Sequence, residues 1–312
     1  MSSYLLRRLW QAIPTLAGVV LLVFFLFKTF GGDPAEILVG LLATPEQIAN
    51  VRRELGLDQP WWVQLGVFVR QILAFDWGHS WATNEPVTTL FATRLPATLT
   101  VMLPILVLEV VLAIPLALAV AAVRGSLTDR LIMVATTVAL SISFLVYVIV
   151  GQWLFGFKLG WFPVQGWSDS VLTNLLRYAP LPVLLAVAVS LAPQTRLYRS
   201  FFLDEIGQDY VRTARAKGLD ERTVLLRHVL RNALIPILTG IGAALPGVFV
   251  GSFLIEVFFS IPGLGREVLL AVNRSDYPVI QAATVYLAVL TMAINLITDV
   301  LYRWVDPRVV LE

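Results

Sequence analysis

Long apolar segments separated by short polar ones dominate the chain. Six of these segments approach or exceed the roughly 20 residues that an α-helix needs to cross the hydrocarbon core of a bilayer. They lie at 9–27, 95–123, 131–157, 178–195, 232–255 and 277–298. The second contains one charged residue, Glu109, and the other five contain none. This pattern predicts an all-α polytopic membrane protein with six transmembrane helices.

The composition agrees with this interpretation. Apolar residues make up 58% of the 312 residues and charged residues 14%, whereas about 25% of a typical soluble domain is charged. A soluble globular or disordered chain is therefore excluded. Cysteine is absent, which excludes disulfides, cysteine-ligated metal sites and thiolate nucleophiles. Prolines inside the apolar segments are compatible with spans, because neighbouring helices can satisfy the freed backbone groups.

The orientation follows from the basic residues. Arg7 and Arg8 precede the first apolar segment, as they would in a cleavable signal peptide. The segment is longer than the apolar core of such a peptide, and residues 30–34 offer no convincing cleavage site, so a retained helix is favoured. With the N-terminus inside, 14 Lys and Arg residues fall in inner segments and eight in outer ones. The positive-inside rule then predicts that both termini are cytoplasmic.

Three regions are expected along the chain. Residues 1–30 hold an N-terminal tail and the first transmembrane helix, and residues 31–94 form a segment outside the membrane. Residues 95–312 form the core transmembrane domain, which includes the other five helices and a cytoplasmic loop at 196–231.

The outer segment carries a helix-start signal. Thr44, Pro45 and Gln47 predict a capping box at the beginning of an amphipathic helix that ends at Gly56. Four tryptophans follow, and their amphipathic rings indicate packing at the membrane interface. They are Trp61, Trp62, Trp77 and Trp81.

The cytoplasmic loop at 196–231 is too long for a turn and too short for a domain. Asp209 is the expected N-cap of a helix over 210–217, with Gly218 after its C-terminus, and Asp220 the expected N-cap of a second helix. Ala214 and Gly218 are small and share one side, which suits close docking of a partner protein. The alternative is a basic segment that rests on anionic lipid headgroups, which composition alone favours.

Motifs for catalysis and for cofactor binding are missing. None of the three lysines follows a glycine, so the chain has no GxxxxGK[ST] sequence for phosphate binding. His79 and His228 are the only histidines and fall on opposite sides of the membrane in this topology. We therefore expect no catalytic, cofactor-binding or metal site, and no enzyme activity of the chain itself.

Two acidic residues lie within or beside the apolar segments. Glu109 falls near the centre of the second segment, where an isolated carboxylate is costly. It can line a transport pathway or gate it, or it can make a structural hydrogen bond within the helix bundle. Asp299 lies near the cytoplasmic end of the sixth segment, and Arg303 at i+4 is its expected partner.

The cytoplasmic loop resembles the coupling-loop motif of ABC-importer permeases. Its matching residues are Tyr210, Val211, Arg212, Thr213, Ala214, Arg215, Ala216, Lys217, Gly218 and Leu219. The general motif reads E-A-A-x-x-x-G, and Gly218 stands at its glycine position. Arg212 replaces the acidic residue, as is common in the dipeptide, oligopeptide and nickel branch of that family. The later proline, expected at Arg231, is displaced to Pro236.

The resemblance extends over nearly the whole chain and in the same order as in the first permease of such systems. The matching stretches include Arg7-Arg8-Leu9, Gly32-Asp33-Pro34-Ala35, Arg53-Glu54-Leu55-Gly56-Leu57-Asp58, Arg94-Leu95-Pro96-Ala97-Thr98, Ser260-Ile261-Pro262-Gly263-Leu264-Gly265-Arg266, Asp276-Tyr277-Pro278 and Asp306-Pro307-Arg308. Each stretch is weak alone, but their shared order is specific. Trp77 is a departure, because leucine is expected there.

The resemblance implies a type I ABC importer permease of the bacterial cytoplasmic (inner) membrane. Its partners would be a second permease, two cytoplasmic ABC ATPase subunits and a periplasmic or lipid-anchored substrate-binding protein, with membrane lipids around it and no nucleic acid. The chain itself would bind no cofactor, since ATP and Mg²⁺ would be used by the ATPase subunits. Transport would proceed by alternating access, with residues 210–219 as the contact to one ATPase.

The resemblance also implies a class of substrate. Peptides are expected on the breadth of the family, with nickel complexes, peptide antibiotics and oligosaccharides as alternatives. A secondary transporter that uses Glu109 as a proton carrier is the other reading, but the two halves of the chain show no convincing internal repeat. A membrane-embedded hydrolase lacks a nucleophile–base pair, and an oligomeric channel leaves the cytoplasmic motif unexplained.

Overall fold

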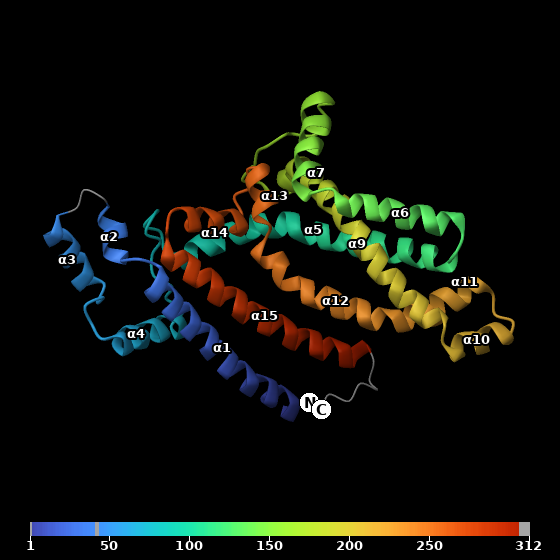
Figure 1. The fold of residues 1–312 in the computed structure, drawn as a ribbon, viewed down its shortest axis with the longest axis horizontal. Coiled ribbons are helices and arrows are strands. Elements are labelled where there is room, and N and C mark those ends of the chain that lie inside the picture. The colour runs from blue at the N-terminus through green and yellow to red at the C-terminus, as the bar shows by residue number, and fades with distance from the viewer. Residues whose placement is uncertain (1, 41–43, 306–312) are drawn as a thin grey trace.

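The computed structural model describes residues 2–40 and 44–305, with side chains described over 7–8, 10–40 and 44–299. Helices make up most of this part of the chain (Figure 1). Five of them are long and apolar enough to cross a membrane, and one bent pair supplies a sixth span. The expected six transmembrane helices are thus confirmed.

The helices of the spans are α1 (Ser2–Phe30), α5 (Val87–Ala122), α6 (Leu127–Ser141) with α7 (Phe144–Gly151), α9 (Pro180–Ile206), α12 (Leu230–Val250) and α15 (Tyr277–Val305). Four of the spans, formed by α1, α5, α9 and α15, are longer than the apolar segments that predict them. The helix expected from residue 95 begins at Val87, because Val87 and Leu90 pack into a buried cluster with α15. The helix expected to end at residue 195 continues, because Tyr198 and Phe202 are buried in the core.

Helices α1 and α15 pack against each other in antiparallel orientation. At the outer end the rings of Phe27 and Tyr277 lie 5.2 Å apart. At the other end Arg8 Nε lies 3.1 Å from Asp299 Oδ2. The start of α1 and the end of α15 therefore lie on the same side. Arg303, the expected partner of Asp299, lies outside the described side chains.

Two buried clusters lie along the contact between α5 and α9. The outer one joins Ala97, Val101 and Ile105 of α5 to the first half of α9, including Leu181 and Leu185. The inner one gathers the inner ends of several helices. It contains Ala113, Ala117, Leu118, Ala121, Tyr198, Phe202, Val211, Ala214, Val224, Val229, Ala233 and Ile237. We call this second cluster the inner core.

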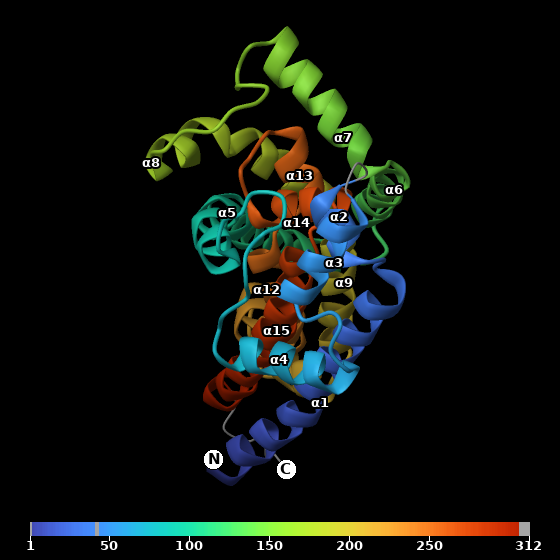
Figure 2. The same ribbon diagram turned by 90° about the vertical axis from the view of Figure 1, so that its left-hand side faces the viewer.

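The third span is bent, although an unbroken helix over 131–157 is expected. α6 and the helix that follows it meet at 88°, and the second arm continues from α7 into a π-helical turn, η1 (Gln152–Lys158). The break falls at Ile142, whose backbone is extended. Ser141 Oγ donates a hydrogen bond to the Thr137 carbonyl at 2.9 Å, a bond that competes with helical pairing and favours a bend. Figure 2 shows α7 projecting away from the other helices.

The fifth span also ends before the expected boundary at residue 255. α12 stops at Val250, and Gly251 takes a φ of +82°, which favours glycine. Two short helices follow before α15: α13 (Phe253–Phe258) and α14 (Leu264–Asn273). The remaining short elements are α8 (Val171–Thr173), the π-helical η2 (Asn174–Tyr178), α10 (Asp209–Ala216), α11 (Glu221–Thr223) and the π-helical η3 (Val224–Val229).

The outer segment contains three helices: α2 (Pro34–Val39), α3 (Pro45–Glu54) and α4 (Trp61–Leu73). The capping box of α3 forms as expected, because Thr44 N–H donates to Gln47 Oε1 at 2.9 Å and Gln47 N–H donates to Thr44 Oγ1 at 3.3 Å. α3 ends at Glu54, followed by Gly56 with a φ of +64°. These helices lie around the outer end of α1 (Figures 1 and 2).

The four tryptophans divide into two pairs. Trp61 and Trp62 lie exposed on α4, which fits an interfacial position. Trp77 and Trp81 are partly buried inside the protein instead. The Trp77 ring lies 6.4 Å from that of Phe91, and the Trp81 ring 5.4 Å from that of Tyr277. The first pair is therefore available for the expected interfacial packing, whereas the second pair packs within the protein.

Candidate functional site

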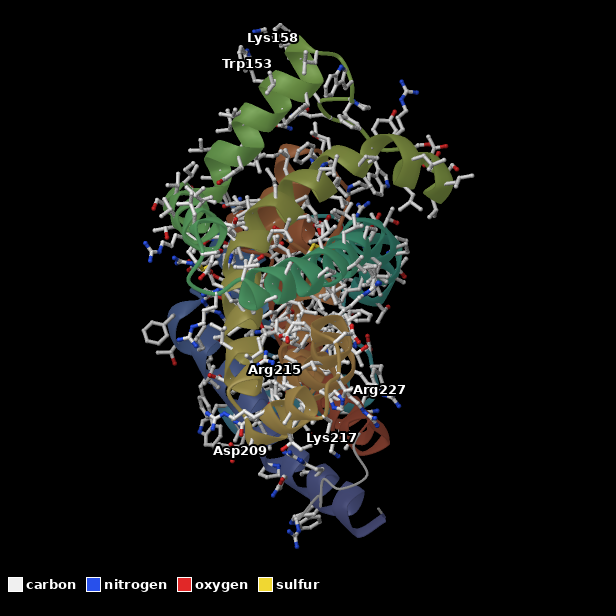
Figure 3. The ribbon with its side chains drawn as sticks, turned by 90° about the vertical axis from the view of Figure 1, so that its right-hand side faces the viewer. Trp153, Lys158, Asp209, Arg215, Lys217 and Arg227 are labelled. Atoms are coloured by element: carbon white, nitrogen blue, oxygen red, sulfur yellow. The ribbon has the colours of Figure 1, made fainter. Side chains whose placement is uncertain are left out.

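The candidate coupling residues lie at the inner end of the helix bundle. We call residues 209–223, which comprise α10, the following turn and α11, the coupling segment. α9 leads into it and η3 leads out of it toward α12. Figure 3 shows Asp209, Arg215 and Lys217 together at this end, while Trp153 and Lys158 mark the far end of the arm formed by α7 and η1.

One face of α10 belongs to the protein's own core. Val211 is fully buried and Ala214 is 5% exposed, and both pack in the inner core with Ala117 of α5 and Phe202 of α9. The sequence places Ala214 on the docking face, and the structure corrects this. Its small side chain is needed because α10 lies directly against the ends of the spans. A displacement of α10 would therefore act on the inner core that it shares with α5 and α9.

The opposite face of α10 is free and charged. The Asp209 side chain is 94% exposed and that of Arg212 is 74% exposed, and the two form an ion pair of 3.3 Å. Thr213, Ala216 and Lys217 complete this exposed face. It presents both signs of charge with a predominance of cations, the kind of surface that steers and orients a protein partner.

The helix boundaries of the coupling segment agree with the sequence in part. Gln208 rather than Asp209 is the N-cap of α10, and it makes no side-chain capping bond. Gly218 follows the C-cap with a φ of +81°, as expected for a C′ glycine. Asp220 caps α11 as predicted and accepts a hydrogen bond from Thr223 N–H at 3.2 Å.

Polar contacts hold α10 in place on both sides. Arg215 donates two hydrogen bonds to the Glu221 carboxylate, at 3.1 Å and 2.6 Å, which ties α10 to α11. The Tyr210 hydroxyl donates to Glu205 Oε2 at the end of α9. Burial, together with the neighbouring Glu205 carboxylate, raises the pKa of Tyr210 to about 12, so this hydroxyl stays a donor at neutral pH. α10 is thus braced against α9 and α11 without the help of a partner.

Glu109 lies in a polar position between two spans. It is half-buried on α5, and its carboxyl group is within hydrogen-bond reach of Ser190 and Gln194 on α9. Tyr198, one turn further along α9, lies close enough to interact with its charge. These side chains supply the partners that an intramembrane carboxyl group requires. The position is compatible with either a pathway role or a structural one.

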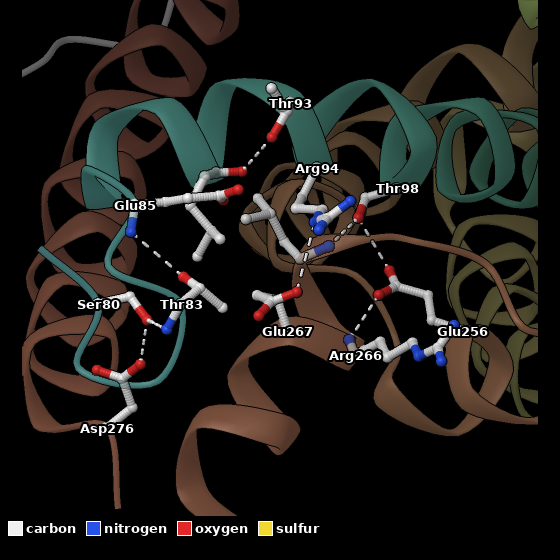
Figure 4. Close-up of polar contacts among 12 residues, drawn as sticks. Ser80, Thr83, Glu85, Thr93, Arg94, Thr98, Glu256, Arg266, Glu267 and Asp276 are labelled. Atoms are coloured by element: carbon white, nitrogen blue, oxygen red, sulfur yellow. Dashed lines mark hydrogen bonds and ion pairs between the residues drawn. The ribbon is translucent and has the colours of Figure 1, made fainter. Parts of the chain in front are cut away.

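A buried glutamate that the sequence analysis does not single out lies at the outer end. Glu256 of α13 is 1% exposed. Its Oε1 accepts a hydrogen bond from Thr98 Oγ1 of α5 at 2.9 Å, and its Oε2 accepts one from Arg266 N–H of α14 at 2.7 Å. Thr98 Oγ1 in turn accepts from Leu264 N–H at 2.8 Å. Figure 4 shows this network joining three helices.

Three glycines make room for the Glu256 side chain because they have no side chains of their own. A Cβ added to Gly251 would lie 2.8 Å from Thr98 Cγ2, and one added to Gly263 would lie 2.6 Å from Thr98 Oγ1. A Cβ on Gly265 would lie 3.1 Å from Glu256 Oε2. We call these glycines with Thr98 the glutamate socket. One sequence signal for it exists, a lone carboxyl group directly after an apolar run and among closely spaced glycines.

Two further contacts hold the outer elements to the bundle. Arg94, one turn before Thr98 on α5, forms an ion pair of 3.4 Å with Glu267 of α14. Asp276, which is buried just before α15, accepts hydrogen bonds from Ser80 Oγ and from Trp81 N–H, the latter at 3.0 Å. Figure 4 shows both contacts at the outer end of α5. They account physically for two of the motif stretches, around Arg94 and around Asp276.

Within the described part of the chain, no group of three or more His, Cys, Asp or Glu side chains is arranged to hold a metal ion. Six spans, an inner segment packed on their ends and polar positions along the bundle define a polytopic membrane protein. Comparison with known proteins identifies which kind.

Two family models match almost the entire chain. The model of binding-protein-dependent transport system inner membrane components matches residues 113–311. The model of the N-terminal part of such membrane components matches residues 1–102. The chain therefore belongs to the family of binding-protein-dependent transport system inner membrane components. It is a multi-pass permease of the bacterial inner membrane, of the type I ABC importer class.

Relatives of similar length carry names within this class. A putative peptide transport system permease of Brucella abortus (strain 2308) is 37% identical over 311 residues, with 99% of each chain covered. A glutathione transport system permease of Salmonella paratyphi A is 36% identical over 312 residues, also with 99% of each chain covered. A dipeptide transport system permease of Alkalihalophilus pseudofirmus is 31% identical, with the same coverage.

Proposed function

We propose that this permease carries peptides, with di- and oligopeptides as the substrate class, across the inner membrane. Support for the substrate comes from the relatives, whose names refer to peptide, dipeptide and glutathione transport. Glutathione is itself a small peptide, so the three names agree on a substrate with amide bonds and charged ends. An extracytoplasmic binding protein would deliver the peptide to the outer mouth of the bundle.

The partners follow from what the chain contains and lacks. A second permease would complete the translocation pathway, and two cytoplasmic ATPase subunits would drive it. ATP and Mg²⁺ would act on those subunits and not on this chain, because its sequence has no phosphate-binding lysine motif. The exposed face of α10 is the proposed contact with one ATPase, since it is charged, free and on the inner side.

The observation that carries this proposal is the packing of α10. Its buried face meets α5 and α9 in the inner core, while its charged face remains open to a partner. ATP binding can move the spans only if it changes the contacts between the two proteins, because an effector shifts a conformational equilibrium by its differential affinity. Bracing by Arg215 and Tyr210, together with the shared inner core, lets such a movement reach the spans. The bundle then alternates between outward and inward access.

Glu109 is the residue that we propose to line the transport pathway or to take part in its gate. Replacement by Gln keeps the size and hydrogen-bonding capacity and removes the charge. Loss of uptake by Glu109→Gln at normal expression supports a role for the charge. Unchanged uptake limits Glu109 to a structural hydrogen bond with Ser190 or Gln194.

The test is uptake of radiolabelled di- and tripeptides by liposomes that contain the purified permeases, ATPases and binding protein. We expect uptake that requires ATP and is inhibited by vanadate. Arg212→Glu should reduce it by about tenfold or more, because like charges across an interface are strongly unfavourable. Arg130→Glu is the control, since Arg130 is also exposed and inner but lies outside the coupling segment. Equal uptake in both variants contradicts the docking role, and failure of peptides to be transported contradicts the substrate class.

A further inference from the structure

A cavity at the outer end of α1 has no part in the proposed transport function. Its volume is about 810 Å³, within the range of small-molecule pockets. Its walls come from α1, α2, α3, α4, the turn over residues 76–84 and the start of α15. It therefore lies between the outer segment and the membrane-spanning part of the protein.

The depth of the cavity follows from the helix positions of its walls. From α1 it is lined by Phe24, Phe27 and Lys28, which fall within about 9 Å of the helix end at Phe30 at 1.5 Å per residue. From α15 it is lined by residues between Tyr277 and Val285, which fall within about 12 Å of that helix start. This depth corresponds to the headgroups and the first part of the acyl chains of the outer leaflet.

The lining changes from apolar to polar along this depth. Phe24, Val67, Phe68 and Val285 supply apolar walls from three helices, and the Phe24 and Phe68 rings lie 6.0 Å apart. The polar part contains two basic and two acidic side chains, Lys28, Arg52, Asp33 and Asp76. An amphiphilic molecule fits such a lining better than a uniformly polar or apolar one.

Lys28 is the group suited to an anion. Its Nζ donates to Gln64 Oε1 at 2.8 Å and lies 5.8 Å from the centre of the Phe24 ring. Among the described residues, no carboxylate lies within ion-pair distance of Lys28. Arg52, the other cation of the lining, is paired with Asp33. An ammonium has three donors, so Lys28 can bind a phosphate oxygen while it keeps the bond to Gln64.

One wall of the cavity, α4, carries residues typical of the membrane interface. α4 carries Trp61 and Trp62 exposed, and the Trp61 ring lies 5.6 Å from that of Phe25 on α1. This contact places α4 at the depth of the upper part of the span, the level at which tryptophan is favoured in membranes. The part of the cavity that α1 and α4 line thus lies at the depth where phospholipids are the most abundant amphiphiles.

We propose that this cavity is a binding site for one phospholipid of the outer leaflet with a zwitterionic headgroup. An acyl chain lies against Phe24, Phe68 and Val285, the phosphate binds Lys28, and the acidic lining favours a headgroup that also carries a positive charge. Such a lipid fills the space between α1, α4 and α15 and holds the outer segment to the bundle. The inference is independent of the peptide substrate and of the coupling segment.

The test is native mass spectrometry of the delipidated complex after titration with phosphatidylethanolamine or phosphatidylglycerol. We expect one phosphatidylethanolamine to be retained by the permease, in preference to phosphatidylglycerol. Lys28→Gln should weaken this binding by about tenfold, the effect of losing a charge-assisted hydrogen bond. Lys158→Gln is the matched control, because Lys158 is also at an outer boundary, over the Trp153 ring, but does not line the cavity.

A second pair of variants tests the cavity by volume. Val67→Trp places a large side chain in the lining, whereas Val69→Trp places the same side chain on α4 outside it. We expect the first to prevent retention of the lipid and the second to leave it unchanged. Equal retention in all four variants, preference for phosphatidylglycerol, or displacement of the lipid by a peptide overturns the proposal. Peptide uptake measured on the same variants keeps this result separate from the transport function.

Discussion

The carboxylate of Glu256 accepts a hydrogen bond from the hydroxyl of Thr98 at 2.9 Å, across 158 positions of the sequence. This bond joins α13, next to the end of the fifth span, to the outer half of α5. Because the same carboxylate also accepts the Arg266 N–H, α5, α13 and α14 meet at one buried group. The outer end of the bundle is therefore organised by a buried carboxyl group, which the membrane environment would otherwise disfavour.

The glutamate socket predicts an intolerance of side chains at Gly263. Gly263→Ala places a Cβ 2.6 Å from Thr98 Oγ1 and against the Glu256 carboxyl group. We expect a loss of about 1–3 kcal/mol in stability from overpacking, measured as a lower melting temperature in detergent. Gly247→Ala is the control, because no atom lies within 4 Å of a Cβ there. Equal melting temperatures for both variants contradict the socket.

Thr98 predicts a second effect at the same place. Thr98→Val keeps the shape but removes the hydroxyl that donates to Glu256 and accepts from Leu264 N–H. Leaving these buried groups without a partner should cost about 1–3 kcal/mol, measured by thermal unfolding. Thr100→Val should have little effect, since that hydroxyl bonds only to a carbonyl of its own helix. A Thr98→Val protein as stable as the Thr100→Val protein shows that the network does not stabilise the fold.

The two faces of α10 predict opposite kinds of defect. Ala214→Asp inserts a carboxyl group into the inner core, so we expect less folded protein in the membrane. Thr213→Asp lies on the exposed face, so we expect normal amounts of folded protein and reduced uptake. Fluorescence-detected size exclusion separates the two results. Normal folding of the Ala214 variant contradicts the packing of α10 described here.

The contact between Asp33 and Arg52 predicts a pH dependence in the outer segment. Partial burial disfavours the charged form, but hydrogen bonds from Arg52 and from Ala35 N–H outweigh it and hold the pKa of Asp33 below its ordinary value of 3.8. With a folded pKa below the unfolded one, the stabilisation is complete above the unfolded value and is lost as the pH falls through the folded one.

Hydrogen exchange measures this effect. Amide protection in α3, corrected for intrinsic rates, should be constant at neutral and mildly acidic pH and should fall below about pH 4. Asp33→Asn should lower the protection and remove the pH dependence. Identical pH profiles for the wild type and this variant contradict a role for the Asp33 charge.

Much of the fold is predictable from the sequence, because a span is a local property. Uninterrupted apolar length predicts the six spans, and local capping chemistry predicts the helix starts at Thr44 and Asp220, both of which the structure contains. Gly218 is likewise recognisable, since its role depends on its own backbone conformation. The coupling segment could be located in this way, although its function stays a proposal.

The rest depends on contacts between distant segments. The inner core that α10 shares with α5 and α9 determines which face of α10 is exposed. Helical spacing alone could therefore not assign Ala214 to the buried face. Asp299 forms an ion pair with Arg8 of another helix, a contact that no local spacing along the sequence indicates. The role of Glu256 depends on its contacts with α5 and α14, which lie beyond its local sequence pattern and are visible only in the structure.

The central claim is that the exposed face of α10 contacts an ATPase subunit and transmits its movement. The most direct measurement is site-specific photocrosslinking in the intact importer, with a probe at Thr213 and a control probe at Asn50, which is exposed on α3. The account predicts an adduct between the Thr213 probe and an ATPase subunit, altered in yield by ATP and vanadate, and none from the control. An assembled, ATP-hydrolysing complex that gives no ATPase adduct from Thr213 would contradict it.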